Sequence, residues 1–225
     1  MAFTYETVVP WGRSFHEYRQ MFSLSDDDLR LDILGCGDGP AGFNSGMAEL
    51  GHLVISCDPL YQYTRDQIQA RIDATYESVM KQTLANRDLF VWERISSPEE
   101  LGRVRLEAMR HFLDDYDRGK QGGRYVAAEL PELPFAPGTF DLAVCSHFLF
   151  LYSANLSLGF HARAIEAMCR VASEVRIFPL LTYDAEPSPY VEPLLENLRR
   201  AGRTVSIQDV PYEFQRGANK MMSIA

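Results

Sequence analysis

The sequence predicts an α/β fold, in which a parallel doubly wound sheet carries helices on both faces. Three observations indicate this fold. Short apolar runs of strand character alternate along the chain with helical patterns. A cluster of glycines directly follows the first of these runs. The second run ends in an acid, Asp58. Because ligands of open parallel sheets bind beyond the carboxyl ends of the strands, we expect the glycines and Asp58 to face one site.

The stretch from Leu31 to Asp58 has the order strand, glycine turn, helix, strand, acid. Pro40 suits the first turn of its helix, and Gly51 suits the end. Glycines allow a ligand to approach the backbone closely, and a helix N-terminus offers free N–H groups. Asp58 stands where a carboxylate accepts both hydrogens of a ribose diol. The stretch therefore predicts half of a nucleotide site.

Two cofactors fit this half-site. The run Gly37–Gly42 matches the G-x-G-x-x-G dinucleotide fingerprint, and Asp58 lies about 20 residues further on, as that motif requires. The run Ile33-Leu34-Gly35-Cys36-Gly37-Asp38-Gly39 also resembles motif I of the class I S-adenosylmethionine (SAM) methyltransferases. Asp32 lies one residue earlier than the usual strand acid of that family.

A second landmark favours SAM over a dinucleotide. Glu129 is followed by Leu133-Pro134-Phe135 and then by Thr139-Phe140-Asp141, an order that resembles the SAM-methyltransferase pattern and that dinucleotide-dependent dehydrogenases do not share. The resemblance covers nearly the whole chain. It implies a Rossmann-like doubly wound seven-stranded sheet, mostly parallel with an antiparallel last strand, plus a helical insertion. The chain also resembles an uncharacterised bacterial group of these enzymes, through Pro-Trp-Gly-Arg at 10–13, Cys-Ser-His-Phe-Leu-Phe-Leu-Tyr at 145–152 and Glu-Phe-Gln-Arg-Gly at 213–217.

The resemblance implies a set of site residues. Expected cofactor contacts are Gly35, Cys36, Gly37, Gly39, Asp58, Pro59, Glu129, Leu130 and Ser146, with Glu129 standing where the family usually has Asp. His147 follows the fourth strand and is the candidate general base; the alternative is a histidine satisfied by a backbone partner. Expected substrate contacts are Arg13, Tyr61, Tyr63 and Tyr152.

Two segments lie outside the common pattern. Residues 1–24 are expected to cap the cofactor, with Ser14 starting a short helix and Arg13 meeting a carboxylate of cofactor or substrate; the alternative is a packed surface segment anchored by Trp11. Residues 62–122 predict an insertion of two helices, which either forms a wall and lid of the acceptor pocket or a dimer surface. Their expected bounds are Thr64 to Phe90 and Ser97 to Gly119.

The rest of the chain continues the alternation. Strands are expected at Tyr125–Ala128, Phe140–Cys145, Glu174–Leu181, Thr204–Val210 and Lys220–Ile224, and helices at Ser157–Val171 and Pro189–Ala201. The 225 residues thus predict a single domain, 1–225.

Composition narrows the function. A net charge of −9 argues against a nucleic-acid partner, since such binding needs a basic surface. No apolar run reaches the roughly 20 residues of a membrane span, and the four cysteines form no C-x-x-C pair, so no metal is expected. The sequence predicts a cytoplasmic enzyme that transfers the methyl group of SAM to a small-molecule substrate. The dimer-surface interpretation of the insertion leaves a homodimer open. The alternatives are a SAM-binding protein without transfer activity and, third, an NAD-dependent oxidoreductase.

Overall fold

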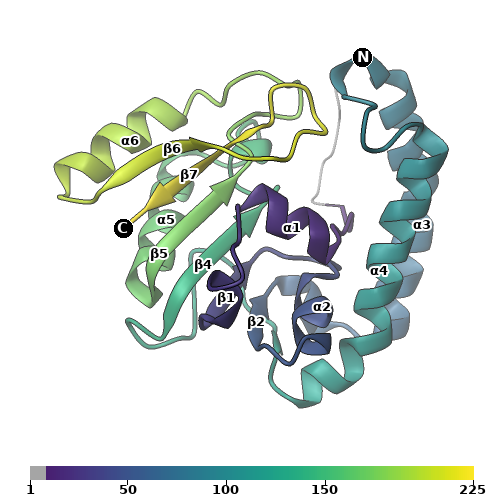
Figure 1. Cartoon of the computed structure of the whole chain (residues 1–225), viewed down its shortest axis with the longest axis horizontal. Helices are drawn as coiled ribbons and strands as arrows, with labels where there is room; N and C mark the ends of the chain where they lie inside the picture. The colour runs from purple at the N-terminus through teal and green to yellow at the C-terminus, as the bar shows by residue number, and fades with distance from the viewer. Residues whose placement is uncertain (1–8) are drawn as a thin grey trace.

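A computed structural model describes residues 9–225, and its centre is a seven-stranded sheet in the order β3-β2-β1-β4-β5-β7-β6 (Figure 1). The strands are β1 Ile33–Cys36, β2 Val54–Cys57, β3 Tyr125–Val126, β4 Phe140–Ser146, β5 Ala172–Phe178, β6 Val205–Asp209 and β7 Lys220–Ile224. Strand β7 pairs antiparallel with both β5 and β6, and the other pairings are parallel. The predicted fold class, a mostly parallel doubly wound sheet with an antiparallel last strand, is confirmed.

Helices cover both faces of the sheet. The helices are α1 Phe15–Met21, α2 Phe43–Glu49, α3 Arg65–Ala85, α4 Pro98–Gln121, α5 Leu158–Val171 and α6 Val191–Arg200, with short 3₁₀ turns at Asp28–Arg30, Pro59–Gln62, Arg87–Leu89 and Phe150–Tyr152. One core cluster joins α5 and α6 to the sheet through Ile165 and Leu194. A second joins α1 and α2 to the opposite face through Met21 and Phe43.

The predicted insertion is the pair α3 and α4, which lie side by side at the right of Figure 1. Their apolar stripes are covered within the chain: Ile72 of α3 and Met109 and Phe112 of α4 are buried together with Tyr61 and Tyr125. Met109 is only 1% exposed, so its replacement by Asp would place a charge inside this cluster and disrupt it. A Met109→Asp variant therefore cannot test whether the insertion forms a dimer surface.

Three predicted helix ends differ clearly from the structure. Helix α3 ends at Ala85 and not at Phe90, because Asn86 caps it and a separate 3₁₀ turn follows at Arg87–Leu89. Helix α2 begins at Phe43 and not near Pro40, because the N-terminal segment crosses the glycine turn there: the Gly42 N–H donates to the Arg13 carbonyl at 2.9 Å. Helix α4 continues through Gly119 to Gln121. Gly119 is required for close packing and not for termination, since a Cβ at this position would lie 2.4 Å from the ring of Tyr125.

Candidate functional site

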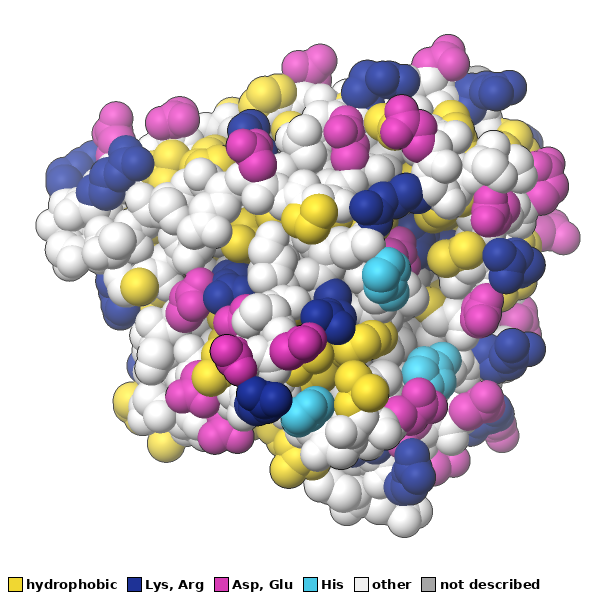
Figure 2. All heavy atoms as spheres, viewed as in Figure 1, with side chains coloured by type: hydrophobic (Ala, Val, Ile, Leu, Met, Phe, Trp, Pro, Cys, Tyr) yellow, Lys and Arg dark blue, Asp and Glu magenta, His cyan; other side chains and the backbone are white. Residues whose placement is uncertain are grey.

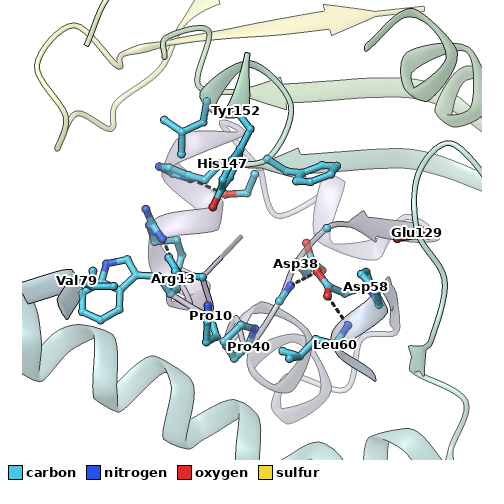
Figure 3. A pocket seen from close by; sticks show the side chains of 18 of the residues that line it. Pro10, Arg13, Asp38, Pro40, Asp58, Leu60, Val79, Glu129, His147 and Tyr152 are labelled. Atoms are coloured by element: carbon cyan, nitrogen blue, oxygen red, sulfur yellow. Dashed lines mark hydrogen bonds between the residues drawn. The ribbon is translucent and has the colours of Figure 1, made fainter. Parts of the chain in front are cut away.

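A cleft of about 1020 Å³ lies beyond the carboxyl ends of β1, β2 and β4. Figure 3 shows its three sides: Asp38, Asp58 and Glu129 on one, Arg13 and Val79 opposite them, and His147 and Tyr152 from the loop after β4. Segments far apart in the sequence therefore meet here, as open α/β sheets predict. A volume at the upper end of the range for single small ligands leaves room for two molecules.

The glycine turn is shaped by the buried carboxyl group of Asp38. It accepts hydrogen bonds from the Tyr18 hydroxyl at 2.9 Å and from Ser56 Oγ at 2.6 Å. A Cβ on Gly35 would lie 1.8 Å from this carboxyl group, so only glycine fits at that position. Burial raises the pKa of Asp38 to about 7, although both hydrogen bonds act in the opposite direction.

Asp58 braces the opposite end of the same turn. Its carboxyl group accepts hydrogen bonds from the backbone N–H of Leu60 at 2.7 Å and of Gly39 at 2.9 Å. Burial raises the pKa of Asp58 to about 6, and the charge of Glu129 acts in the same direction. A carboxylate has about four acceptor positions, so Asp58 retains capacity for two ligand hydroxyls.

His147 stands at the end of β4 in a left-handed conformation, with φ of 53°. Its backbone N–H donates to the Phe178 carbonyl at 2.7 Å, and its ring Nδ1 lies 2.8 Å from Ser146 Oγ. Burial and then the cations of Arg13 and Arg105 hold the pKa of His147 well below its ordinary value. The ring is therefore uncharged at neutral pH and carries one hydrogen.

Ser146 connects His147 to α1. Its hydroxyl donates to Met21 Sδ at 3.9 Å and lies 2.8 Å from His147 Nδ1. A hydroxyl has one hydrogen, so a Ser146 that donates to Met21 is left to accept from His147. This direction places the ring hydrogen on Nδ1 and leaves the Nε2 lone pair open. Tyr18, on the same helix, donates to Asp38.

Opposite the acids lie two arginines, the buried Arg105 and the half-buried Arg13. Arg105 is completely buried and donates from Nη1 to Glu17 at 2.7 Å, and Tyr212 donates to the other Glu17 oxygen at 2.9 Å. Burial opposes ionisation of Glu17, but the Arg105 cation outweighs it and lowers the pKa of Glu17 to about 2. Arg13, which lines the cleft, donates from Nη1 to the Trp11 carbonyl.

The structure brings most of the predicted site residues to the cleft. Those that line it are Arg13, Gly37, Gly39, Asp58, Pro59, Tyr63, Glu129, Leu130, Ser146, His147 and Tyr152. Three others do not line it. Gly35 makes room for Asp38, and Cys36 is buried within the sheet beside Cys57. Tyr61 is 1% exposed and donates to the Gly39 carbonyl at 2.8 Å, so it supports the turn from behind and does not face a substrate.

Several residues of the cleft and its supports are absent from the sequence prediction. Asp38 carried a signal, as an acid within the glycine motif itself. Arg105 carried another, because it is a cation at an apolar stripe position, four residues after Leu101 and four before Met109. Tyr18 was expected only on the apolar face of its helix, and its contact with Asp38 is tertiary.

Within residues 9–225, no cluster of three or more His, Cys, Asp and Glu side chains is arranged to hold a metal ion. Over the same residues, none of the helices combines the length and the apolar character needed to cross a membrane. On the face drawn in Figure 2, basic and acidic side chains are interspersed.

No protein-family model matches the sequence. An uncharacterized protein of Methanocaldococcus jannaschii is 28% identical over 214 residues, which cover 95% of this chain and 94% of that protein. Among solved structures, the magnesium protoporphyrin IX methyltransferase of Synechocystis with bound SAM is similar over 93% of this chain and 89% of its own, at 10% identity and a TM-score of 0.46. The N-methyltransferase NodS of Bradyrhizobium japonicum is similar over 93% and 94%, at 14% identity and a TM-score of 0.46. Both likenesses have TM-scores below 0.5.

Proposed function

We propose that this protein transfers the methyl group of SAM to a small-molecule acceptor. The observation that carries the proposal is the cleft itself, in which a glycine turn, Asp58 and Glu129 line one side and the uncharged His147 lines another. The acids fit a nucleoside and a cationic sulfonium, because a carboxylate accepts from ribose hydroxyls and attracts positive charge. The interspersed surface charges and the net charge of −9 favour a small acceptor over a nucleic acid.

Each side of the cleft has a role in this proposal. Asp58 binds the ribose, Glu129 and Leu130 hold the adenine, and Gly37 and Gly39 let the cofactor approach the backbone. A Cβ on Gly37 would also meet the ring of Phe148 at 3.2 Å. Residues 9–24 cap the cofactor from the N-terminal side; residues 1–8 of the expected cap lie outside the described part of the chain.

The insertion forms a wall of the acceptor half of the cleft. Its residues that line the cleft are Gln62, Tyr63, Gln67, Ile68, Arg71, Val79, Thr83, Phe90 and Leu101. This supports the pocket-wall interpretation of residues 62–122. Dimer formation stays a prediction.

SAM, when bound, supplies an activated methyl on a sulfonium sulfur. The residues that line the cleft would hold acceptor, methyl and sulfur in line, which is a contribution of orientation. His147, which lines the cleft, takes at Nε2 the proton that the acceptor atom loses.

Calorimetric titration tests this function. We expect SAM and S-adenosylhomocysteine to bind and NAD to bind far more weakly. Asp58→Ala should weaken SAM binding by about 1.5–3 kcal/mol, the range for hydrogen bonds to a charged group. The control is Asp66→Ala, which removes an exposed acid of α3. Tight NAD binding without heat from SAM would overturn the proposal, and equal SAM affinity in both variants would place the cofactor elsewhere.

A further inference from the structure

Within residues 9–225, the cleft wall opposite the acids has two cations and one carboxylate that pairs with them. The cations are Arg13 and Arg105, because an arginine in a protein keeps its proton. Of the described carboxylates, Glu17 acts on the charge of Arg13. Its two oxygens already accept from Arg105 and from Tyr212, as well as from the N–H and hydroxyl of Ser14.

Arg13 has donor groups to spare. Within residues 9–225 its guanidinium makes a single hydrogen bond, from Nη1 to Trp11, and its buried Nε has no partner. Nε and Nη2 of Arg105 behind it are also unpartnered. Burial, together with the Arg105 cation, lowers the pKa of Arg13. Arg13 is half-buried, but a buried guanidinium N–H without a partner beside a second cation is costly, so this arrangement suits an anion.

The surroundings of Arg13 describe the rest of the ligand. Arg13 lies on the same side of the cleft as Val79 and across from the acids that would hold the nucleoside (Figure 3). The lining of the cleft as a whole includes apolar and aromatic side chains such as Phe90, Leu101 and Phe214, together with polar ones such as Gln67, Thr83 and Gln215. An apolar body next to a cation suits an organic acid.

We propose that the methyl acceptor is an apolar or aromatic molecule with one anionic group, a carboxylate or a phosphate monoester, which Arg13 binds. The proposal rests on the methyl-transfer function above. The anion anchors the acceptor at the Arg13 wall and leaves its nucleophilic atom free to face His147. Arg105 does not touch the acceptor; it is a positioning residue that holds Glu17 away from Arg13 and adds to the positive potential.

The test uses the full chain saturated with S-adenosylhomocysteine and three probes: benzoate, phenyl phosphate and the uncharged benzamide. Saturation-transfer NMR titration should show benzoate or phenyl phosphate binding and benzamide not, and the preferred anion distinguishes a carboxylate from a phosphate. Arg13→Met should weaken the anionic probe about tenfold or more, the loss expected for charge-assisted hydrogen bonds. Arg110→Met, which removes an exposed arginine of α4 outside the cleft, is the control and should leave binding within about twofold. Arg13→Lys keeps the charge and should retain part of the affinity.

A second titration identifies whose anion Arg13 binds. S-adenosylhomocysteine carries a carboxylate and 5′-methylthioadenosine does not. If Arg13 serves the acceptor, Arg13→Met leaves the affinity for both compounds unchanged. If Arg13→Met weakens only S-adenosylhomocysteine, the anion belongs to the cofactor and the proposal fails. Equal binding of benzoate and benzamide by the saturated protein also overturns it while leaving the methyl-transfer function intact. Failure of the parent protein to bind S-adenosylhomocysteine overturns both.

Discussion

His147 depends on a neighbour that is remote in sequence for the form of its ring. Ser146 lies beside it in the chain, but Met21, whose sulfur accepts from Ser146 at 3.9 Å, comes from α1. The group that accepts the Ser146 hydrogen decides the direction of the bond to His147, because a hydroxyl has a single hydrogen to donate. Met21 is therefore a positioning residue, and its effect on His147 can be measured without knowing the methyl acceptor.

Met21→Leu should move the ring hydrogen of His147 from Nδ1 toward Nε2. Without the Met21 sulfur, Ser146 is free to donate to Nδ1. The measurement is long-range ¹⁵N–¹H correlation of the His147 ring at about pH 8, where the ring is neutral. Met47→Leu, which changes another buried methionine of the same core cluster, should leave the hydrogen on Nδ1. A hydrogen on Nε2 in the parent protein would contradict the proposed direction.

At the scale of the elements, glycines mark close approaches as well as turns. Gly119 lies inside α4, where glycine costs about 1 kcal/mol relative to alanine. Its presence is explained by Tyr125 of β3, whose ring leaves no space for a Cβ. The helix and the edge strand are thereby held close together, and the edge strand leads to Glu129 of the cleft.

Gly119→Ala should destabilise the protein by about 1–3 kcal/mol, because overpacking against Tyr125 outweighs the gain in helix propensity. Gly159→Ala is the matched control. Gly159 lies in the first turn of α5, is exposed, and has its nearest neighbour at 3.6 Å from a Cβ, so this change should be neutral or stabilising by up to about 1 kcal/mol. Urea denaturation measures both. Equal stability of Gly119→Ala and the parent would show that α4 and β3 are less tightly packed than described.

At the scale of the whole molecule, the cleft couples stability to pH. The pKa values of Asp38 and Asp58 are raised to about 7 and about 6 from an ordinary 3.8. The folded chain therefore binds these protons more tightly than the unfolded chain does. Their stabilising contribution is complete below about pH 4 and is lost as the pH rises through about 6 and 7. The contribution of Glu17 to stability changes with pH in the opposite direction. The pKa of Glu17 is lowered to about 2, so its contribution is present above about pH 4.5 and is lost in stronger acid.

We expect the thermal midpoint of the parent to fall between about pH 5 and pH 8. The Asp38 share corresponds to a free energy of unfolding on the order of 3 kcal/mol over this window. Asp38→Asn should flatten the fall, since an amide does not titrate, and Asp26→Asn, an exposed acid, should not change it. Calorimetric scans of the three proteins in buffers of equal ionic strength provide the measurement. A midpoint that rises with pH in the parent, or identical slopes for the parent and Asp38→Asn, would contradict the assignment of these pKa values.

Much of this protein could be predicted from the sequence. The alternation of apolar runs and helical patterns predicted the sheet, and the caps Ser14, Ser97 and Ser157 begin helices as expected. The glycine turn and Asp58 were recognisable because all their residues are neighbours along the chain or lie at a fixed spacing. Helical periodicity is also a local pattern, so the pair α3 and α4 was expected from the sequence alone.

The tertiary structure decided the rest. Pro40 does not begin a helix because the N–H of Gly42 bonds to Arg13, and Gly119 does not end one because it packs against the ring of Tyr125. No local pattern encodes either contact. The bond between Arg105 and Glu17 joins residues 88 positions apart, and it engages the carboxylate that would otherwise be open to Arg13. Periodicity and spacing describe which face of an element is buried, but they do not state which residues that face contacts. Charge balance and hydrogen-bond direction depend on those contacts, so only the folded chain determines them.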